Sequence, residues 1–201
     1  MSPRPDVTEA RKGQILQAAI TVFSRLGLDQ ARMDDIVAES GLSKGAIYWY
    51  FKSKDEIIAA ILESVFNREI IELKGLLEAD GPVVARLLRF VRHAAAEIKA
   101  MTHLSPILYE FYALAFRDKA VRKALQVDFR RYLRLAGPLI QQGVERGELR
   151  PVEASVAANG LAAIVEGTML LWVFDRAAFD IEQQIATAAS IFLDGLRNRH
   201  D

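Results

Sequence analysis

Residues 41–54 combine small, aromatic and basic side chains at helical spacing. They read Gly-Leu-Ser-Lys-Gly-Ala-Ile-Tyr-Trp-Tyr-Phe-Lys-Ser-Lys. At 100° per residue, Ile47 and Phe51 fall on one side of a short helix, while Gly45 and Trp49 lie opposite. Small residues let a backbone approach base edges, and aromatic rings contact sugar, phosphate and thymine methyl groups. The outward face therefore has the chemistry of a helix that enters the major groove of DNA.

Each of these side chains also has an ordinary alternative. Aromatic residues are often largely buried, so Tyr48, Trp49 and Tyr50 could form a cluster in the core, with Tyr50 the most buried of the three. Lys52 and Lys54 follow the helix, where they can pair with the phosphate backbone but would otherwise be solvated charges. Their position directly after the aromatic segment favours the phosphate contact.

Two short helices, separated by Ser-Gly-Leu-Ser at residues 40–43, must hold these side chains in place. Gly41 suits the left-handed conformation that ends the first helix, because it has no side chain to clash. Leu42 would fill the corner between the helices, and Ser43 can cap the second helix with its hydroxyl. Lys44 then begins the second helix, within reach of a base acceptor or a phosphate. These are the requirements of a helix-turn-helix.

Residues 8–56 resemble the DNA-binding domain of the TetR family of bacterial transcriptional regulators. The resemblance is carried by residues 41–51, followed by Lys52, Lys54 and Asp55. It implies double-stranded DNA as a partner, with contacts at Lys44, Gly45, Ala46, Tyr48, Trp49, Tyr50 and Lys54. The chain departs from the family at Ala31 and Arg32, where the family usually has a Thr or Ser that caps the first short helix and touches phosphate. Arg32 can still reach a phosphate.

The rest of the chain has helical periodicity, and no alternating pattern is long enough to predict a strand. Gly27 is expected to end a first helix that covers about residues 7–26. Further helices are predicted after Ser53, over about residues 84–101, from Ser105, over about 119–146, from Glu153 and over about 181–197. We therefore predict an all-α fold, with a three-helix helix-turn-helix domain over residues 1–54. Residues 55–201 are predicted to form a helical ligand-binding and dimerisation domain.

Aromatic residues and isolated polar groups in the C-terminal part have two interpretations. A packed core is the default, whereas the resemblance implies a pocket for a small, largely apolar effector. Glu166 lies in apolar surroundings and would be either an effector contact or a buried helix-packing residue. The candidate pocket residues are Met101, Tyr109, Tyr112, Phe116, Phe129, Tyr132, Glu166, Met169 and Trp172. Arg86, Arg89 and His93 recur on one helix face, which predicts a solvated stripe rather than an anion site.

Two apolar helices near the C-terminus supply a means of forming a homodimer. A single helix-turn-helix makes few base contacts, so specific binding generally needs two, about 34–36 Å apart on one face of the DNA. The helices could pack as a four-helix bundle across a two-fold axis. The predicted interface residues are Leu161, Val165, Ile185, Ala188, Phe192 and Leu196.

Composition excludes several classes of protein. The 26 basic residues balance 26 acidic ones, so net charge does not indicate a nucleic-acid partner. The chain contains no cysteine, which excludes disulfides and thiolate metal sites, and we expect no metal or other cofactor. Residues 154–174 are apolar and long enough to cross a bilayer, but the central Glu166 favours a buried or subunit-facing helix over a membrane span.

These observations predict a cytoplasmic, non-enzymatic regulator of transcription. We expect a repressor that binds a pseudo-palindromic operator as a homodimer and is released from the DNA by a small-molecule effector. Two alternatives remain open at this point. One is a small-molecule-binding or enzymatic helical bundle with a vestigial helix-turn-helix, although no phosphate-binding loop or metal-ligand spacing supports it. The other is an adaptor that holds another protein on the same surface.

Overall fold

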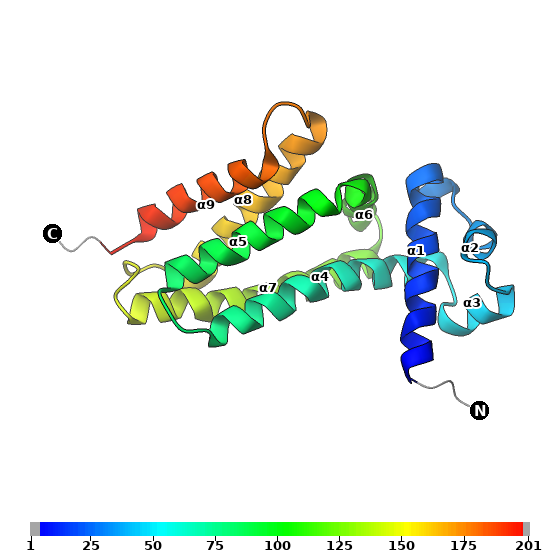
Figure 1. Ribbon diagram of the computed structural model, residues 1–201, viewed down its shortest axis with the longest axis horizontal. Helices are drawn as coiled ribbons and strands as arrows, with labels where there is room; N and C mark the ends of the chain where they lie inside the picture. The colour runs from blue at the N-terminus through cyan, green and yellow to red at the C-terminus, as the bar shows by residue number, and fades with distance from the viewer. Residues whose placement is uncertain (1–4, 199–201) are drawn as a thin grey trace. The chain divides into compact units, whose positions relative to one another are not determined.

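The computed structural model describes residues 5–198, except for the side chains at helix positions 5, 6, 65, 66, 68, 69, 103, 106 and 120. The fold is all-helical (Figure 1), which confirms the predicted class. The helices are α1 (Pro5–Gln30), α2 (Met33–Ser40), α3 (Lys44–Tyr50), α4 (Lys54–Glu78), α5 (Val83–Ala100), the 3-10 turn η1 (Thr102–Leu104), α6 (Ser105–Ala115), α7 (Lys119–Glu145), α8 (Ala154–Phe174) and α9 (Ile181–Leu196).

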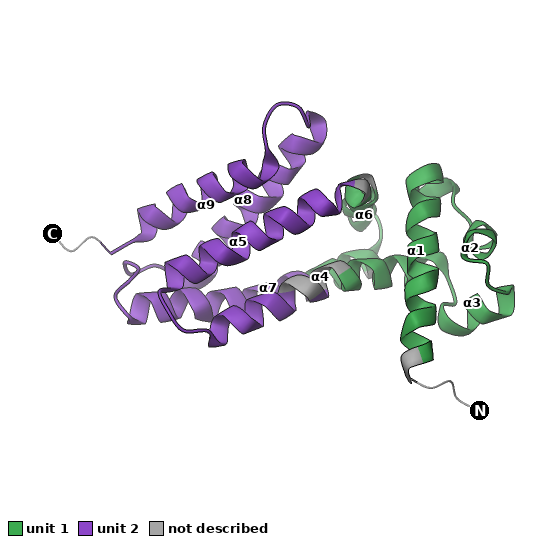
Figure 2. Ribbon diagram, in the orientation of Figure 1, with its two compact units in different colours: residues 1–66, 103–126 green, residues 67–102, 127–201 purple. Residues whose placement is uncertain are grey.

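The chain forms two compact units, coloured separately in Figure 2. Unit 1 contains residues 1–66 and 103–126, and unit 2 contains residues 67–102 and 127–201. The sequence predicts a boundary after residue 54. The unit that holds the helix-turn-helix instead extends into α4 and takes in α6, which is distant in sequence.

Unit 1 is built around a single apolar core to which α6 contributes. Phe23 of α1, Ile36 of α2 and Ile47 of α3 are buried in it, together with Ile57 of α4. Phe111 of α6 is also fully buried in this core. Other residues of α6 that are buried in the core or packed against it are Ile107, Leu108, Leu114 and Ala115, and Leu104 of η1 also packs against it.

The first helix is interrupted where the sequence predicts its end. Gly27 has φ 74° and ψ 165°, a conformation that side chains with a Cβ rarely adopt. The segment that follows makes one further helical turn, with the Ala31 N–H donating to the Gly27 carbonyl at 3.3 Å. Gly27 therefore separates the long, straight part of α1 from the turn that leads to α2.

In unit 2, α9 packs against both α5 and α8. Val91 of α5, Ile185 and Ala189 of α9 and Leu139 of α7 are all buried in this unit. The N-terminus of α9 is fixed by Asp180, whose carboxylate accepts the Gln183 N–H at 2.9 Å. These contacts form a helical core that is separate from that of unit 1.

Arg86 corrects the prediction of a solvated stripe on α5. Its side chain is only 2% exposed, whereas Arg89 is exposed and His93 is half-buried. The Arg86 guanidinium donates to the carbonyls of Leu76 at 2.9 Å and Ala79 at 2.8 Å, where α4 ends. It also donates to the side chain of Gln142. Arg86 therefore satisfies the last carbonyls of α4, which have no partners within the helix.

Candidate nucleic-acid interface

The second helix of the motif, α3, is fixed at its start and along its inner side. Gly41 has φ 66°, the left-handed conformation expected at the end of α2. The Ser43 hydroxyl accepts the Ala46 N–H at 3.2 Å, which confirms the predicted cap. Ile47 is fully buried and Phe51 is nearly so. The inner side of α3 is therefore committed to the core, as its spacing predicts.

The outer side of α3 presents backbone and aromatic surface to solvent. A Cβ placed on Gly45 would meet nothing within 4 Å, so the helix backbone is open to close approach there. Trp49 is 58% exposed, and its ring meets the edge of Tyr50 at 4.7 Å between centroids. Tyr50 is half-buried against the core, as expected, and Ala46 and Tyr48 are also half-buried. An exposed tryptophan beside an open backbone suits entry into a groove.

Lys44 is exposed on this outer side and is held by α2. Its ammonium lies 2.7 Å from the carboxylate of Asp34 and 5.9 Å from the centroid of the Tyr48 ring. The hydrogen bond that Lys44 donates to the Asp34 carboxylate raises the pKa of Lys44 above its usual 10.5. A phosphate that binds Lys44 must therefore compete with Asp34.

Lys52 and Lys54, both predicted to contact phosphate, have different surroundings. Lys52 is exposed and its ammonium donates to the Tyr48 carbonyl at 2.5 Å, at the end of α3. The ammonium of Lys54 points into unit 1, where it donates to the carbonyls of Leu28 and Ala31. Lys54 therefore has an internal structural role, whereas Lys52 stays available to a phosphate.

Arg32 stands at the N-cap of α2 without capping it by its side chain, because a guanidinium has no acceptor atom. The other half of the cap does form, since the Asp35 carboxylate accepts the Arg32 N–H at 2.8 Å. The Arg32 side chain is exposed. With Arg32 at this position, the Arg32 N–H still has a hydrogen-bond acceptor, and the guanidinium is exposed to solvent.

Two polar residues of the motif were not predicted from the sequence. Ser40 is buried, and its hydroxyl donates to the Val37 carbonyl at 3.0 Å and accepts the Leu42 N–H at 3.2 Å. The Gln14 amide of α1 donates to the Ser40 carbonyl at 2.9 Å. The hydroxyl at the turn is a local signal, but the contact with Gln14 spans 26 residues and has none.

The nine candidate effector-pocket residues are divided between the two units. In unit 2, the Tyr132 ring stacks with Phe90 and with Phe129, at centroid distances of 6.3 and 6.4 Å. Met169 and Trp172 are buried and Met101 is half-buried. Glu166 is exposed in the single chain, which does not fit the alternative of a helix-packing residue buried within the subunit.

The other three candidates belong to unit 1. Tyr109 and Tyr112 are half-buried and meet edge to face at 5.8 Å, while Phe116 is 84% exposed. Within unit 1, Tyr109 and Tyr112 therefore lie together and Phe116 points to solvent.

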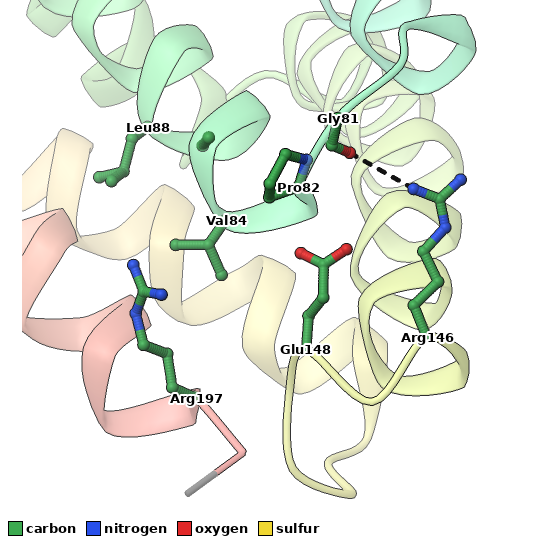
Figure 3. Close-up of a pocket in the computed structure, with 8 residues that line it drawn as sticks. Gly81, Pro82, Val84, Leu88, Arg146, Glu148 and Arg197 are labelled. Atoms are coloured by element: carbon green, nitrogen blue, oxygen red, sulfur yellow. Dashed lines mark hydrogen bonds between the residues drawn. The ribbon is translucent and has the colours of Figure 1, made fainter.

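A cleft of about 530 Å³ in unit 2 is lined by none of these nine residues (Figure 3). Val84 and Leu88 form its apolar floor, and Arg146, Glu148 and Arg197 surround it. The charged groups are bonded within the protein: Arg146 donates to the Gly81 carbonyl, the Glu148 carboxylate accepts the Val83 N–H, and Arg197 donates to Asp194. The cleft is thus a feature of the α5 and α9 ends, apart from the predicted effector site.

The predicted dimer residues lie mostly on the inner faces of α8 and α9. Leu161, Ile185 and Leu196 are buried within unit 2, and the Phe192 ring packs on Gly160, where an added Cβ would lie 3.0 Å from the ring. Val165 and Ala188 are half-buried. Side chains covered inside one subunit have little area left for a partner, and the dimer interface itself stays a prediction.

The outer face of α8 is apolar and exposed. Val156 is 62%, Leu170 39% and Phe174 78% exposed, and Ala163 and Gly167 lie between them on the same face. Among the described residues, α8 is the one helix that is long and apolar enough to cross a membrane, and 28% of its most apolar stretch is buried. A helix with one covered and one exposed apolar face agrees with the predicted subunit-facing role.

Comparisons with known proteins match both parts of the chain. Residues 15–61 match the family described as bacterial regulatory proteins, tetR family, and residues 82–197 match the C-terminal family of BetI-type transcriptional repressors. The HTH-type transcriptional regulator YfiR of Bacillus subtilis is 30% identical over 96% of both chains. The HTH-type transcriptional regulator BetI of Serratia proteamaculans is 25% identical over 97% of both chains.

Solved structures share the fold. SmeT, the repressor of the Stenotrophomonas maltophilia multidrug efflux pump SmeDEF, has a TM-score of 0.80 at 25% identity, covering 96% of this chain and 93% of SmeT. A complex of SmeT with triclosan has a TM-score of 0.82 at 24% identity, with 95% and 93% covered. FadR of Bacillus subtilis in complex with stearoyl-CoA has a TM-score of 0.80 at 18% identity, with 92% and 98% covered. The helix-turn-helix geometry and these matches agree, and the chain belongs to the TetR family of bacterial transcriptional regulators.

Proposed function

We propose that this regulator is a cytoplasmic repressor that binds a pseudo-palindromic operator as a homodimer and leaves it when a small, largely apolar effector binds. The observation that carries the proposal is the division of α3. Ile47 and Phe51 hold the helix to the core, while Gly45 and Trp49 are presented to solvent. The exposed aromatic ring beside an open helix backbone is a surface that a DNA groove would cover.

The proposed DNA contacts divide into two kinds. Gly45, Ala46, Tyr48 and Trp49 face the groove, where ring and backbone contacts with sugars and base edges would set the register. Lys44, Lys52 and Arg32 are the exposed cations around them and would pair with phosphates. Lys54 is left out of the proposed phosphate contacts because its ammonium is bonded inside unit 1.

The homodimer is proposed to form through the outer face of α8. Val156, Leu170 and Phe174 are too exposed and too regularly spaced to be an ordinary solvated surface. Ala163 and Gly167 between them would allow two helices to approach closely. A two-fold arrangement of two chains would supply the paired helix-turn-helix motifs that specific operator binding requires.

The effector is proposed to be an apolar molecule bound in unit 2. Proteins of the same fold have been solved with triclosan, which is largely apolar, and with stearoyl-CoA, whose acyl chain is apolar. In this chain the stacked rings of Phe90, Tyr132 and Phe129 and the buried Met169 offer a comparable surface. The effector would release DNA if it binds more tightly to the dimer in which the spacing of the two helix-turn-helix motifs does not fit the operator.

Binding of the DNA that flanks its own gene tests the proposal directly. Fluorescence anisotropy should show saturable binding. The logarithm of the binding affinity should fall linearly with the logarithm of the salt concentration. Tyr48→Ala should weaken binding without altering the circular dichroism spectrum, whereas Glu63→Ala, at an exposed position on α4, serves as the matched control. Equal affinity of the native chain for unrelated DNA, with no effect of Tyr48→Ala, would contradict the proposal.

A further inference from the structure

A carboxylate from α6 bonds the backbone next to the break in α1. Glu110 accepts the Leu28 N–H at 2.7 Å, although the two residues are 82 positions apart. Gly27 precedes this N–H, and a Cβ built on Gly27 would lie 3.5 Å from the Glu110 carboxylate. The carboxylate therefore sits directly against the interruption of the helix.

The Leu28 N–H needs this partner because of the shape of the chain. The positive φ of Gly27 turns the backbone out of the helical path, so the usual acceptor four residues earlier is no longer in line. Leu28 is itself buried, whereas Glu110 is exposed, so the bond between them is partly buried. A buried N–H without an acceptor is strongly unfavourable, and the Glu110 carboxylate supplies a charged one.

The carbonyl of the same residue is held from another element. Lys54, at the start of α4, donates to the Leu28 carbonyl and, at 3.0 Å, to the Ala31 carbonyl. Glu110 and Lys54 thus bind the two backbone groups of Leu28 and cover the turn over residues 28–31. Arg32 and Met33, where α2 begins, follow immediately. The direction in which α2 leaves this turn determines where α3 points.

We propose that Glu110 is a positioning residue for DNA binding, acting through the Leu28 N–H on the turn that orients α2 and α3. The inference rests on the proposed function, since it concerns the same DNA-binding surface. Glu110 makes no DNA contact in this proposal. Without its bond, the turn samples other conformations, and the operator selects the fraction in which α3 is correctly oriented.

Two possible roles of Glu110, repulsion of phosphate by its charge and acceptance of the Leu28 N–H, predict opposite changes in operator affinity. If Glu110 acted only as an anion that repels phosphate, both Glu110→Gln and Glu110→Ala would strengthen operator binding. A positioning role predicts that Glu110→Gln, which keeps an acceptor oxygen, stays within about twofold of the native affinity, whereas Glu110→Ala weakens it about fivefold to tenfold. Glu63→Ala removes an exposed carboxylate from α4 and should leave affinity unchanged.

Hydrogen exchange of the Leu28 amide, followed by NMR in the full-length protein, separates positioning from general destabilisation. In Glu110→Ala this amide should exchange much faster, while the amide of Ala19, in the upstream part of α1, should keep its native rate. Unchanged exchange at Leu28, or fast exchange with native operator affinity, would overturn the proposal. If Glu110→Ala loses the fold, as circular dichroism would reveal, the rescue by Glu110→Gln decides: weakened binding in that variant contradicts the positioning role.

The two levels of inference fail in different ways. If the native chain binds no DNA, the proposed function is wrong and the role of Glu110 in DNA binding is overturned with it. If the native chain binds its operator and the Glu110 variants bind it with native affinity, the proposed function stands and the positioning role alone is wrong.

Discussion

The ammonium of Lys44, the first residue of α3, lies 2.7 Å from the carboxylate of Asp34 on α2. This pair joins the two helices of the motif at their exposed side, where DNA is proposed to bind. It also places a negative charge beside the cation that would meet a phosphate. The pair therefore steadies the motif in the free protein and opposes phosphate binding at the same point.

Replacing Asp34 with Asn should strengthen DNA binding. The Asp34→Asn variant removes the anion and frees Lys44, so affinity should rise about two- to fivefold at low salt. The slope of log affinity against log salt concentration, measured by anisotropy, should become steeper. Glu63→Gln, which removes a carboxylate from an exposed site on α4, should do neither. Weaker binding by Asp34→Asn would mean that the pair is needed to place Lys44.

Lys52 and Lys54 should respond differently to the same substitution. Lys52→Met should reduce the magnitude of the salt slope by about one and leave the free energy of unfolding unchanged, because it removes an exposed cation. Lys54→Met should instead lower the free energy of unfolding by about 1–3 kcal/mol, since it leaves the Leu28 and Ala31 carbonyls without a donor. Urea denaturation and salt titrations measure both quantities, and an equal loss of stability in the two variants would contradict this division.

The local motif could be predicted from sequence because its requirements are local. Gly41, Ser43 and Ile47 act on neighbours within four residues, so spacing alone indicated the turn, the cap and the buried side of α3. The internal bonds of Lys54 could not be predicted because its acceptors lie 23 and 26 residues earlier, where no periodicity connects them. The bond of Glu110 to Leu28 is further still from any local signal.

The C-terminal helices show a second limit. In α8 nearly every position is apolar, so periodicity could not distinguish the face that packs on α9 from the face left exposed. Leu161 and Phe192 were accordingly assigned to a partner although they pack within the subunit. Arg86 was expected on the surface because an isolated arginine usually is, whereas three carbonyls at the end of α4 provide it with buried acceptors.

Arg86 should be more important for stability than any other arginine of α5. Arg86→Met leaves the terminal carbonyls of α4 and the Gln142 side chain without a donor in a buried site, which should cost about 2–4 kcal/mol. Arg89→Met, on the exposed side of the same helix, should change the free energy of unfolding by less than about 0.5 kcal/mol. Chemical denaturation at a fixed protein concentration compares the two, and similar values would argue against the capping role.

Asp180 should make stability depend on acid pH. The Gln183 N–H, followed by the Lys99 ammonium, lowers the pKa of this carboxyl below its usual 3.8. A carboxyl whose pKa is lower in the folded state stabilises the protein when the pH is above the ordinary pKa. That stabilisation disappears as the pH falls through the pKa of the folded state. Asp180→Ala should therefore melt below the native protein at about pH 7, and the gap should narrow toward about pH 3. A difference in melting temperature that widens as the pH falls would contradict a lowered pKa for Asp180.

The outer face of α8 should control both assembly and DNA binding. Phe174 is 78% exposed in the single chain, so Phe174→Asp removes little contact within the subunit, and circular dichroism should stay native. If two chains meet through this face, the charge placed there should convert the dimer to a monomer in sedimentation velocity experiments. Operator affinity should then fall by at least about 100-fold, because one motif alone makes too few base contacts. Val127→Asp, at an exposed position on α7, provides the control and should remain dimeric. A Phe174→Asp protein that stays dimeric and binds its operator would place the interface on another surface.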